Sequence, residues 1–133
     1  MSYWTHVNGS MRVDATPLTN EEVKNLFKTC TFYGTEKEWL ECNVPRGSEG
    51  SIDVSIWFNP CAEDIRRMVI TMFGDLRGYE ESQHDDFISW LNKIIEDNTL
   101  WVSDGIITLN EKVYRYDDDL EKFIFICKEI DIC

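Results

Sequence analysis

Acidic side chains are the residues of this sequence whose number and grouping offer the most chemistry. The 133-residue chain has 25 Asp and Glu residues against 13 Lys and Arg residues, a net charge of −12. Carboxylates from different elements can together hold Mg²⁺, as in a metal-dependent nuclease. The run Asp117–Asp119 lacks the alternating ligand spacing and the distal Glu of a calcium-binding loop. We therefore predict no metal site and no cofactor, and keep a metal-dependent hydrolase or nuclease as an alternative.

Nucleophilic chemistry has no recognisable motif in the chain. His6 and His84 are the only two histidines, and neither stands at a motif spacing from a Ser or a Cys. The patterns HExxH, GxxxxGK[ST], GxGxxG and GxSxG are absent from the sequence. The five cysteines are odd in number, widely spaced and without a CxxC pair, which is typical of reduced thiols in a cytosol. We expect no catalytic residue, and hence a protein that is not an enzyme.

The negative charge restricts the class of partner. It repels the phosphates of nucleic acids and anionic membranes, and it favours a protein with a basic surface. Arg46, Arg66, Arg67 and Arg77 form no basic stretch interleaved with aromatic residues, so we expect no direct nucleic-acid binding. A small anionic ligand held by Arg46 or Arg77 remains open. The sequence has neither a signal-peptide pattern nor an apolar run long enough for a membrane span, so we expect a cytoplasmic protein.

Two acidic groups and one turn are the candidate partner-binding residues. Asp75 to Tyr79 lies where a predicted strand gives way to a helix, and loops in such places often carry function. The acids that follow occupy the first turns of that helix, where its dipole also favours negative charge. The predicted site comprises Asp75, Arg77, Tyr79, Glu80, Glu81, Asp85, Asp86, Asp117, Asp118 and Asp119.

The strongest secondary-structure signal is a pair of strands between residues 51 and 78. From Ser51 to Phe58, apolar and other residues alternate, which predicts a strand with one buried face. The run from Met68 to Phe73 is apolar on both faces, which predicts a central strand covered at least in part on both sides. We expect the two to pair antiparallel, with Gly74 and Gly78 marking a bulge or the strand end.

The other elements follow from shorter patterns. Residues 3–13 predict either a tight hairpin at Asn8-Gly9 or one long strand with a glycine bulge. Capping pairs predict helices at about 20–30, begun by Thr19 with Glu22, and at about 83–97, begun by Ser82 with Asp85. Short strands are predicted at 100–102, 106–109, 113–116 and 123–127, with turns at 103–105 and 117–119. Residues 31–50 give no clear prediction.

This order of elements predicts a single α+β domain over residues 1–133. The pattern β-α-β-β-α-β with additional C-terminal strands is typical of a ferredoxin-like sandwich, in which two helices cover one face of an antiparallel sheet. Trp4, Trp57 and Phe73 can lie on the other face. We therefore expect that face to be a contact surface or the seam of a homodimer.

Three short segments carry a resemblance to a known group of proteins. They are Ser2–His6 (SYWTH) leading into a strand, Gly47–Gly50 (GSEG) before another strand, and Phe73–Arg77 (FGDLR). In these three segments the chain resembles small uncharacterised proteins encoded by tailed phages and prophages of Gram-positive bacteria. None of the segments is a mechanistic motif, so no catalytic residue is transferred.

The resemblance implies a phage accessory protein that acts in the cytosol of the bacterial host. Small acidic phage proteins often counter host defence, and anti-CRISPR proteins commonly block the nucleic-acid groove of an effector. The expected function is therefore inhibition of a CRISPR effector through an acidic surface. The alternatives are a metal-dependent hydrolase, a phage structural or assembly protein, and sequestration of a nucleotide immune signal.

Overall fold

The computed structural model describes residues 3–60 and 67–128 of the chain. Within them, one antiparallel sheet has six strands in the order β4-β5-β1-β6-β7-β8. These strands are β1 (Trp4–Ala15), β4 (Asp53–Phe58), β5 (Met68–Arg77), β6 (Trp101–Leu109), β7 (Lys112–Asp117) and β8 (Lys122–Cys127). The other elements are α1 (Asn20–Leu26), α2 (Glu36–Glu41), α3 (His84–Asp97), the 3₁₀ helix η1 (Glu81–Gln83), and the short strands β2 (Arg46–Gly47) and β3 (Gly50–Ser51).

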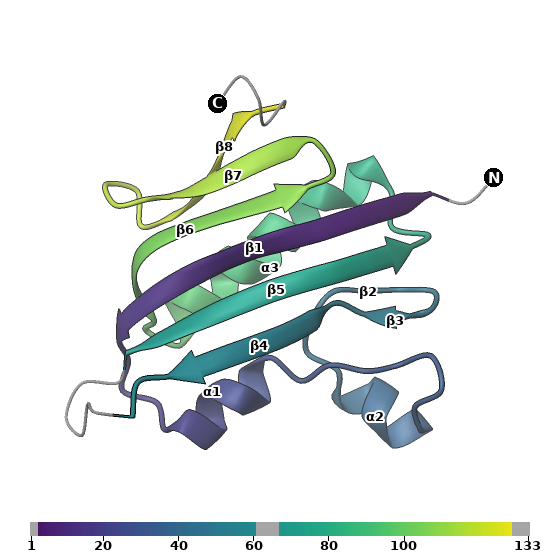
Figure 1. Cartoon of the computed structure of the whole chain (residues 1–133), viewed down its shortest axis with the longest axis horizontal. Coiled ribbons are helices and arrows are strands. Elements are labelled where there is room, and N and C mark those ends of the chain that lie inside the picture. The colour runs from purple at the N-terminus through teal and green to yellow at the C-terminus, as the bar shows by residue number, and fades with distance from the viewer. Residues whose placement is uncertain (1–2, 61–66, 129–133) are drawn as a thin grey trace.

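The core lies between the sheet and α3, which Figure 1 shows crossing behind the strands. Phe87 and Leu91 of α3 are fully buried in one cluster with Met11 of β1 and Met72 of β5. α1 joins the same layer through Phe27, whose ring meets Trp90 of α3 edge to face. The predicted α+β class is therefore confirmed, with its helical layer on one face of the sheet.

The order of elements differs from the predicted β-α-β-β-α-β. α2 and the two-stranded pair β2–β3 stand between α1 and β4, largely within residues 31–50, for which the sequence patterns are not clear. Thr35 begins α2 by accepting a hydrogen bond from the Glu38 amide (3.2 Å), a capping pattern of the same kind as that of Thr19. None of the helices in the described ranges is long and apolar enough to cross a membrane.

β1 is one long strand and not a hairpin at Asn8-Gly9. Its pairing with both neighbours runs without a shift through Gly9, and the irregular pairing with β6 lies farther on, after Arg12. A Cβ at position 9 would lie 2.5 Å from the Ile106 carbonyl oxygen. The glycine therefore permits close approach of the β6 backbone, and neither a turn nor a bulge explains it.

The β4–β5 pair is confirmed, and β5 is an interior strand of the sheet. Its core-facing side chains are buried, whereas on the other side Val69 and Thr71 are half-buried and Phe73 is exposed. β5 is therefore covered on one face, because α1 and α3 both lie on the same side of the sheet. β5 ends at Arg77, and Gly78 follows with a φ of 73°, a left-handed conformation that glycine adopts readily.

The turn predicted at residues 103–105 is wrong, because β6 continues through it. Gly105 pairs with Met11 of β1. A Cβ at position 105 would lie 2.5 Å from the Phe123 ring, so the glycine makes room for an aromatic side chain from β8. The chain reverses later, at Asn110, which has a φ of 57°.

Both predicted helices exist, with different ends. The Thr19–Glu22 capping box is present, with both hydrogen bonds at 3.1 Å, but α1 ends at Leu26 rather than near Cys30. Beyond α1, the Cys30 amide donates to the Ser51 hydroxyl (2.9 Å), so the backbone there bonds to another segment instead of continuing the helix. α3 follows η1, whose first turn is closed by Glu80 and Gln83 (2.9 Å) rather than by Ser82 and Asp85.

Gly9→Ala should destabilise the protein by about 1–3 kcal/mol, because the added methyl group overpacks the contact between β1 and β6. Urea unfolding followed by circular dichroism measures the change. Ser10→Ala, one residue away on the open side of the same strand, should change stability by no more than about 0.5 kcal/mol. Equal effects of the two substitutions would contradict this explanation of Gly9.

Candidate functional site

The outer surface of α3 carries acidic side chains at both ends of the helix. The helix buries His84, Phe87, Ile88, Leu91 and Ile95 and turns its other side to solvent. On that side are Asp85, Asp86, Glu96 and Asp97, which form no ion pair within residues 3–60 and 67–128. Lys93 is the basic residue of the helix. This side of the molecule is therefore strongly negative.

The residues before α3 differ in their exposure. Tyr79 is buried, with 7% of its surface exposed, and burial together with Asp86 raises the pKa of its hydroxyl to about 12. Glu80 and Glu81 are exposed. Glu81 pairs with Lys112 of β7 (3.2 Å), and this hydrogen-bonded contact lowers the pKa of the Glu81 carboxyl. Glu80 is thus available to a partner, whereas Glu81 already pairs with a lysine and the Tyr79 side chain is buried.

Asp75 and Arg77 point away from α3, on the open side of β5. The Asp75 carboxylate lies 2.5 Å from Nδ1 of His6 on β1, and both side chains are more than half exposed. Arg77 pairs with Glu49 (2.6 Å), and its guanidinium lies 6.0 Å from the Trp4 ring centroid. These two predicted site residues therefore belong to the open side of the sheet, not to the acidic surface of α3.

Asp117–Asp119 form the turn between β7 and β8, as predicted. The Asp117 carboxylate accepts a hydrogen bond from the Leu120 amide (2.9 Å) and so holds the turn. Asp118 and Asp119 are exposed. The turn lies near the end of α3, about 20 Å from its start for a helix of 14 residues. The predicted site residues therefore occupy three separate places.

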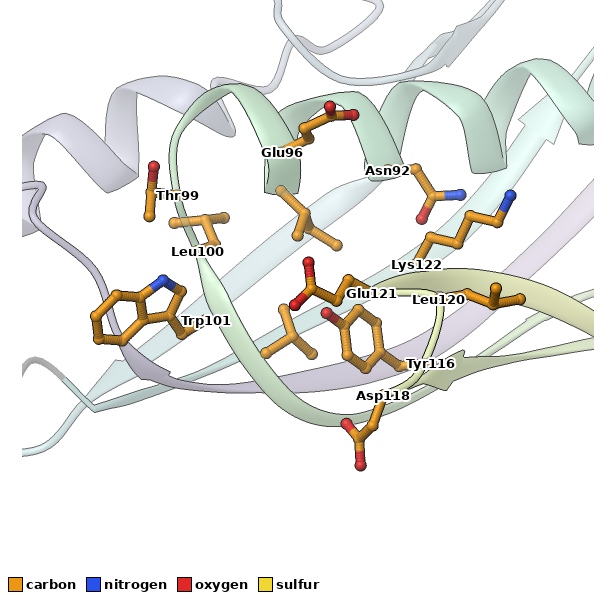
Figure 2. Close-up of a pocket in the computed structure, with 12 residues that line it drawn as sticks. Asn92, Glu96, Thr99, Leu100, Trp101, Tyr116, Asp118, Leu120, Glu121 and Lys122 are labelled. Carbon is orange, nitrogen blue, oxygen red and sulfur yellow. The ribbon is translucent and has the colours of Figure 1, made fainter.

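The β7–β8 turn borders a cleft that sequence reasoning did not find. This acidic cleft, of about 560 Å³, lies between the last turns of α3, the start of β6 and the β7–β8 hairpin. Figure 2 shows Trp101 at one end of it and Lys122 at the other. Its acids are Glu96, Asp118 and Glu121.

The side chains of the acidic cleft suit a cationic group. The pKa of the Tyr116 hydroxyl is raised, mainly by burial and to a smaller extent by the charges of Glu121 and Asp118. Trp101 is 64% exposed, so one face of an electron-rich ring is open to a ligand. Glu121 follows the predicted acidic turn closely in the sequence, but only the tertiary structure adds Glu96 and Trp101.

A second cleft, of about 570 Å³, has both histidines in its lining, near the start of α3. His84 is almost fully buried, and its Nε2 lies 2.9 Å from the Thr5 hydroxyl. That hydroxyl donates its proton to the Tyr79 carbonyl (2.6 Å), so His84 Nε2–H is the donor to Thr5. The pKa of His84 is lowered, mainly by burial and to a smaller extent by the charge of Lys112. His84 is therefore neutral, with its proton on Nε2.

This geometry does not resemble that of a catalytic pair. Thr5 is completely buried, so its hydroxyl cannot reach a substrate, and its proton is already donated to a carbonyl. His84 Nδ1 is buried and has no hydrogen-bond partner in the described part of the chain. Residues 3–60 and 67–128 also contain no group of three or more His, Cys, Asp or Glu side chains placed to hold a metal ion.

The cysteines differ from one another in state. Cys30 is a buried free thiol and Cys42 a half-buried one. Burial, with a contribution from the neighbouring Cys42, raises the pKa of the Cys30 thiol, which makes it less nucleophilic. Cys127 is disulfide-bonded, so the expectation that all the thiols are reduced is wrong for this residue.

Comparisons with protein-family models, with curated proteins and with solved structures found no match to this chain.

The buried neutral state of His84 predicts a pH dependence of stability. Because its folded-state pKa is lower than the usual 6.5, the unfolded chain takes up the proton first as the pH falls. The free energy of unfolding should therefore decrease as the pH falls through the usual pKa of histidine, about 6.5, toward the lower folded-state pKa. His84→Gln, which keeps a donor but does not titrate, should show a smaller decrease, measured by urea unfolding at each pH. His6→Gln serves as the control and should retain the wild-type decrease; the idea fails if His84→Gln retains it too.

Proposed function

We propose that this protein is a non-enzymatic binding protein that holds a basic segment of a protein partner in the acidic cleft. The observation that carries the proposal is the composition of this cleft: its lining has three carboxylates, from Glu96, Asp118 and Glu121, but one lysine, Lys122, and it includes an exposed tryptophan. An Arg or Lys side chain of a partner is the protein group that best matches such a lining.

The chemistry of recognition follows from these side chains. Glu96 and Glu121 line the cleft from different elements, and the charge-assisted hydrogen bonds that a carboxylate accepts from an arginine are the stronger kind. The Trp101 ring can stack on a guanidinium or an ammonium group, a contact that contributes about 0.5–2 kcal/mol. A basic, extended segment of a partner is therefore the expected occupant.

The rest of the surface supports the same partner. Asp85 and Asp86 lie at the start of α3 and Asp97 lies beside Glu96 at its end, and the whole chain carries a charge of −12. Such a field attracts a basic protein from a distance and repels nucleic-acid phosphates. The proposal consequently does not include direct binding of DNA or RNA.

The sharpest version of this function is inhibition of a host defence system by a phage protein in the bacterial cytosol. The partner is then a CRISPR effector, whose basic nucleic-acid groove has the charge that the acidic cleft and α3 require. This version is supported by the resemblance of Ser2–His6 and Phe73–Arg77 to phage proteins and by the sign of the charge.

A ferredoxin-like topology is the finer form of the fold that we propose. β1 and β4 are both antiparallel to β5, so they are parallel to each other, and α1 lies between them in the chain. β5 and β6 are likewise parallel and connected through α3. Two interleaved split βαβ units are the basis of that topology. The β2–β3 pair and α2 then form an insertion, and β7 and β8 extend the sheet.

The double substitution Glu96→Gln and Glu121→Gln should weaken partner binding by at least about tenfold, equivalent to about 1.4 kcal/mol. Trp101→Ala should have a similar effect through loss of the stacking surface. The experiment is a pull-down with the tagged protein from phage-infected host lysate, followed by affinity measurement with the purified partner. Glu36→Gln with Glu111→Gln removes the same charge elsewhere and should weaken binding much less. If both double variants lost the same amount of binding affinity, the cleft would have no specific role in recognition.

Binding should also weaken steeply as salt is added, because the screening length falls from about 10 Å at 0.1 M salt to about 3 Å at 1 M. Titration of the partner at these two salt concentrations measures the effect. An affinity that does not change with salt would exclude recognition of a basic surface by charge. Capture of a nucleotide or a metal ion instead of a protein would move the function to a different class.

A further inference from the structure

The side of the sheet opposite α3 is the most unusual surface of the molecule. We use the term open face for the side chains of β4, β5, β1 and β6 that point away from α3, together with Arg115 of β7. Trp57 is 57% exposed on this face, and Trp4, Phe73 and Ile106 are each 41% exposed. They come from four different strands, so the apolar area extends across the sheet. Surfaces of this kind usually mark an interface.

The open face is also nearly neutral, unlike the rest of the protein. Its charged side chains are Arg12, Arg77 and Arg115, against Asp14, Asp53, Asp75 and Asp104. The acidic excess of the chain therefore lies elsewhere, in part on α3 and around the acidic cleft. A strongly basic partner finds no net charge here. Two copies of a chain with a charge of −12 repel each other least at this face.

Two of these charges are placed for pairing between copies. Asp53 on β4 and Arg115 on β7 form no ion pair within the described ranges, 3–60 and 67–128. In the sheet order, β4 and β7 lie two strands away from β1 on opposite sides. About 19 Å therefore separates their strands within one copy, four times the usual spacing. Asp53 and Arg115 cannot meet within a single copy.

A two-fold axis that runs along β1, above the open face, brings Asp53 of one copy near Arg115 of the other. Such an axis stacks the open faces of two copies, so that β4 of one copy lies over β7 of the other. The cross-strand register places Ser55 in one row with Thr71, Ser10, Ile106 and Arg115. Asp53 is two residues from Ser55, or about 7 Å along β4, which is within the reach of an arginine side chain. The same operation places Phe73 of β5 over β6 of the other copy.

We propose that the protein forms a two-fold symmetric homodimer through its open face, with Asp53 of each copy paired to Arg115 of the other. Aligned packing of two sheet faces is a common arrangement, with the sheets about 10 Å apart. The open face measures about 24 by 28 Å, or about 700 Å² per copy, close to the roughly 800 Å² per partner of a standard interface. Phe73 and Ile106 lie at its centre, where apolar anchors contribute most to binding.

The experiment is a charge exchange followed by sedimentation velocity over a range of micromolar protein concentrations. Arg115→Asp and Asp53→Arg should each raise the dimer dissociation constant by about tenfold or more, because each places like charges opposite one another. The double variant Asp53→Arg with Arg115→Asp should return it toward the wild-type value. Such a recovery of dimerisation can come only from a pair between copies, because positions 53 and 115 are too far apart within a single copy.

Matched controls separate this interface from other forms of self-association. Lys93→Asp and Asp97→Arg make the same charge changes on the outer side of α3 and should leave dimerisation unchanged. Phe73→Thr should weaken the dimer while circular dichroism stays that of the folded protein. A wild-type chain that remains monomeric throughout the concentration range would overturn the proposal. A dimer that is insensitive to Arg115→Asp and Phe73→Thr would overturn it as well, since that dimer would use another surface.

Discussion

The structure depends on the position of β1 between two long antiparallel partners. β1 pairs with β5 from Trp4 to Val13 and with β6 from Val7 to Ala15. Its inward side chains, among them Val7, Met11 and Val13, lie against the helical layer. A strand between two partners pairs its backbone amides and carbonyls with both of them. β1 therefore fixes the register of β5 and of β6 together. The other strands add to this group of three.

The arrangement of helices on one face of the sheet around β1 produces two kinds of surface. α1 and α3 belong to connections that cross the same face, so the opposite face of β1 and its neighbours stays uncovered. Acidic residues gather on the covering layer, on α3, and at the β7–β8 hairpin beside the end of that helix. Arginines and aspartates are nearly balanced on the uncovered sheet. A single chain thus has a strongly negative side and a nearly neutral, aromatic side, and the two favour different partners.

Polar groups inside the molecule have mainly structural roles. The Tyr79 carbonyl, the Thr5 hydroxyl and His84 form a buried chain of hydrogen bonds that joins the start of α3 to β1. Asn92 makes a similar link near the other end of α3, where it bonds to both the amide and the carbonyl of Phe123. These contacts hold α3 at a fixed position on the sheet, because each buried donor and acceptor involved must keep its partner. The positions of the acidic residues follow from this placement.

The sequence by itself determined the local elements for which one pattern was unambiguous. Period-two alternation located β4, and the Thr19–Glu22 box marked the start of α1. It also showed which aromatic residues lie on the uncovered face. Glycine was misleading: Gly105 indicated a turn, whereas its actual role is to make room for Phe123 across the sheet. A contact of that kind involves residues distant in the chain, so no local pattern contains it.

Only the tertiary structure decided which charged residues share a surface. Asp75 and the acids of α3 are close in the sequence, yet they lie on opposite sides of the sheet, because β5 and α3 belong to different layers. Glu96, Trp101 and Glu121 come from three elements and meet in one cleft. Sequence patterns report which face of its own element a side chain occupies. The packing of those elements, set by burial of the core and by the pairing of β1, determines which faces adjoin.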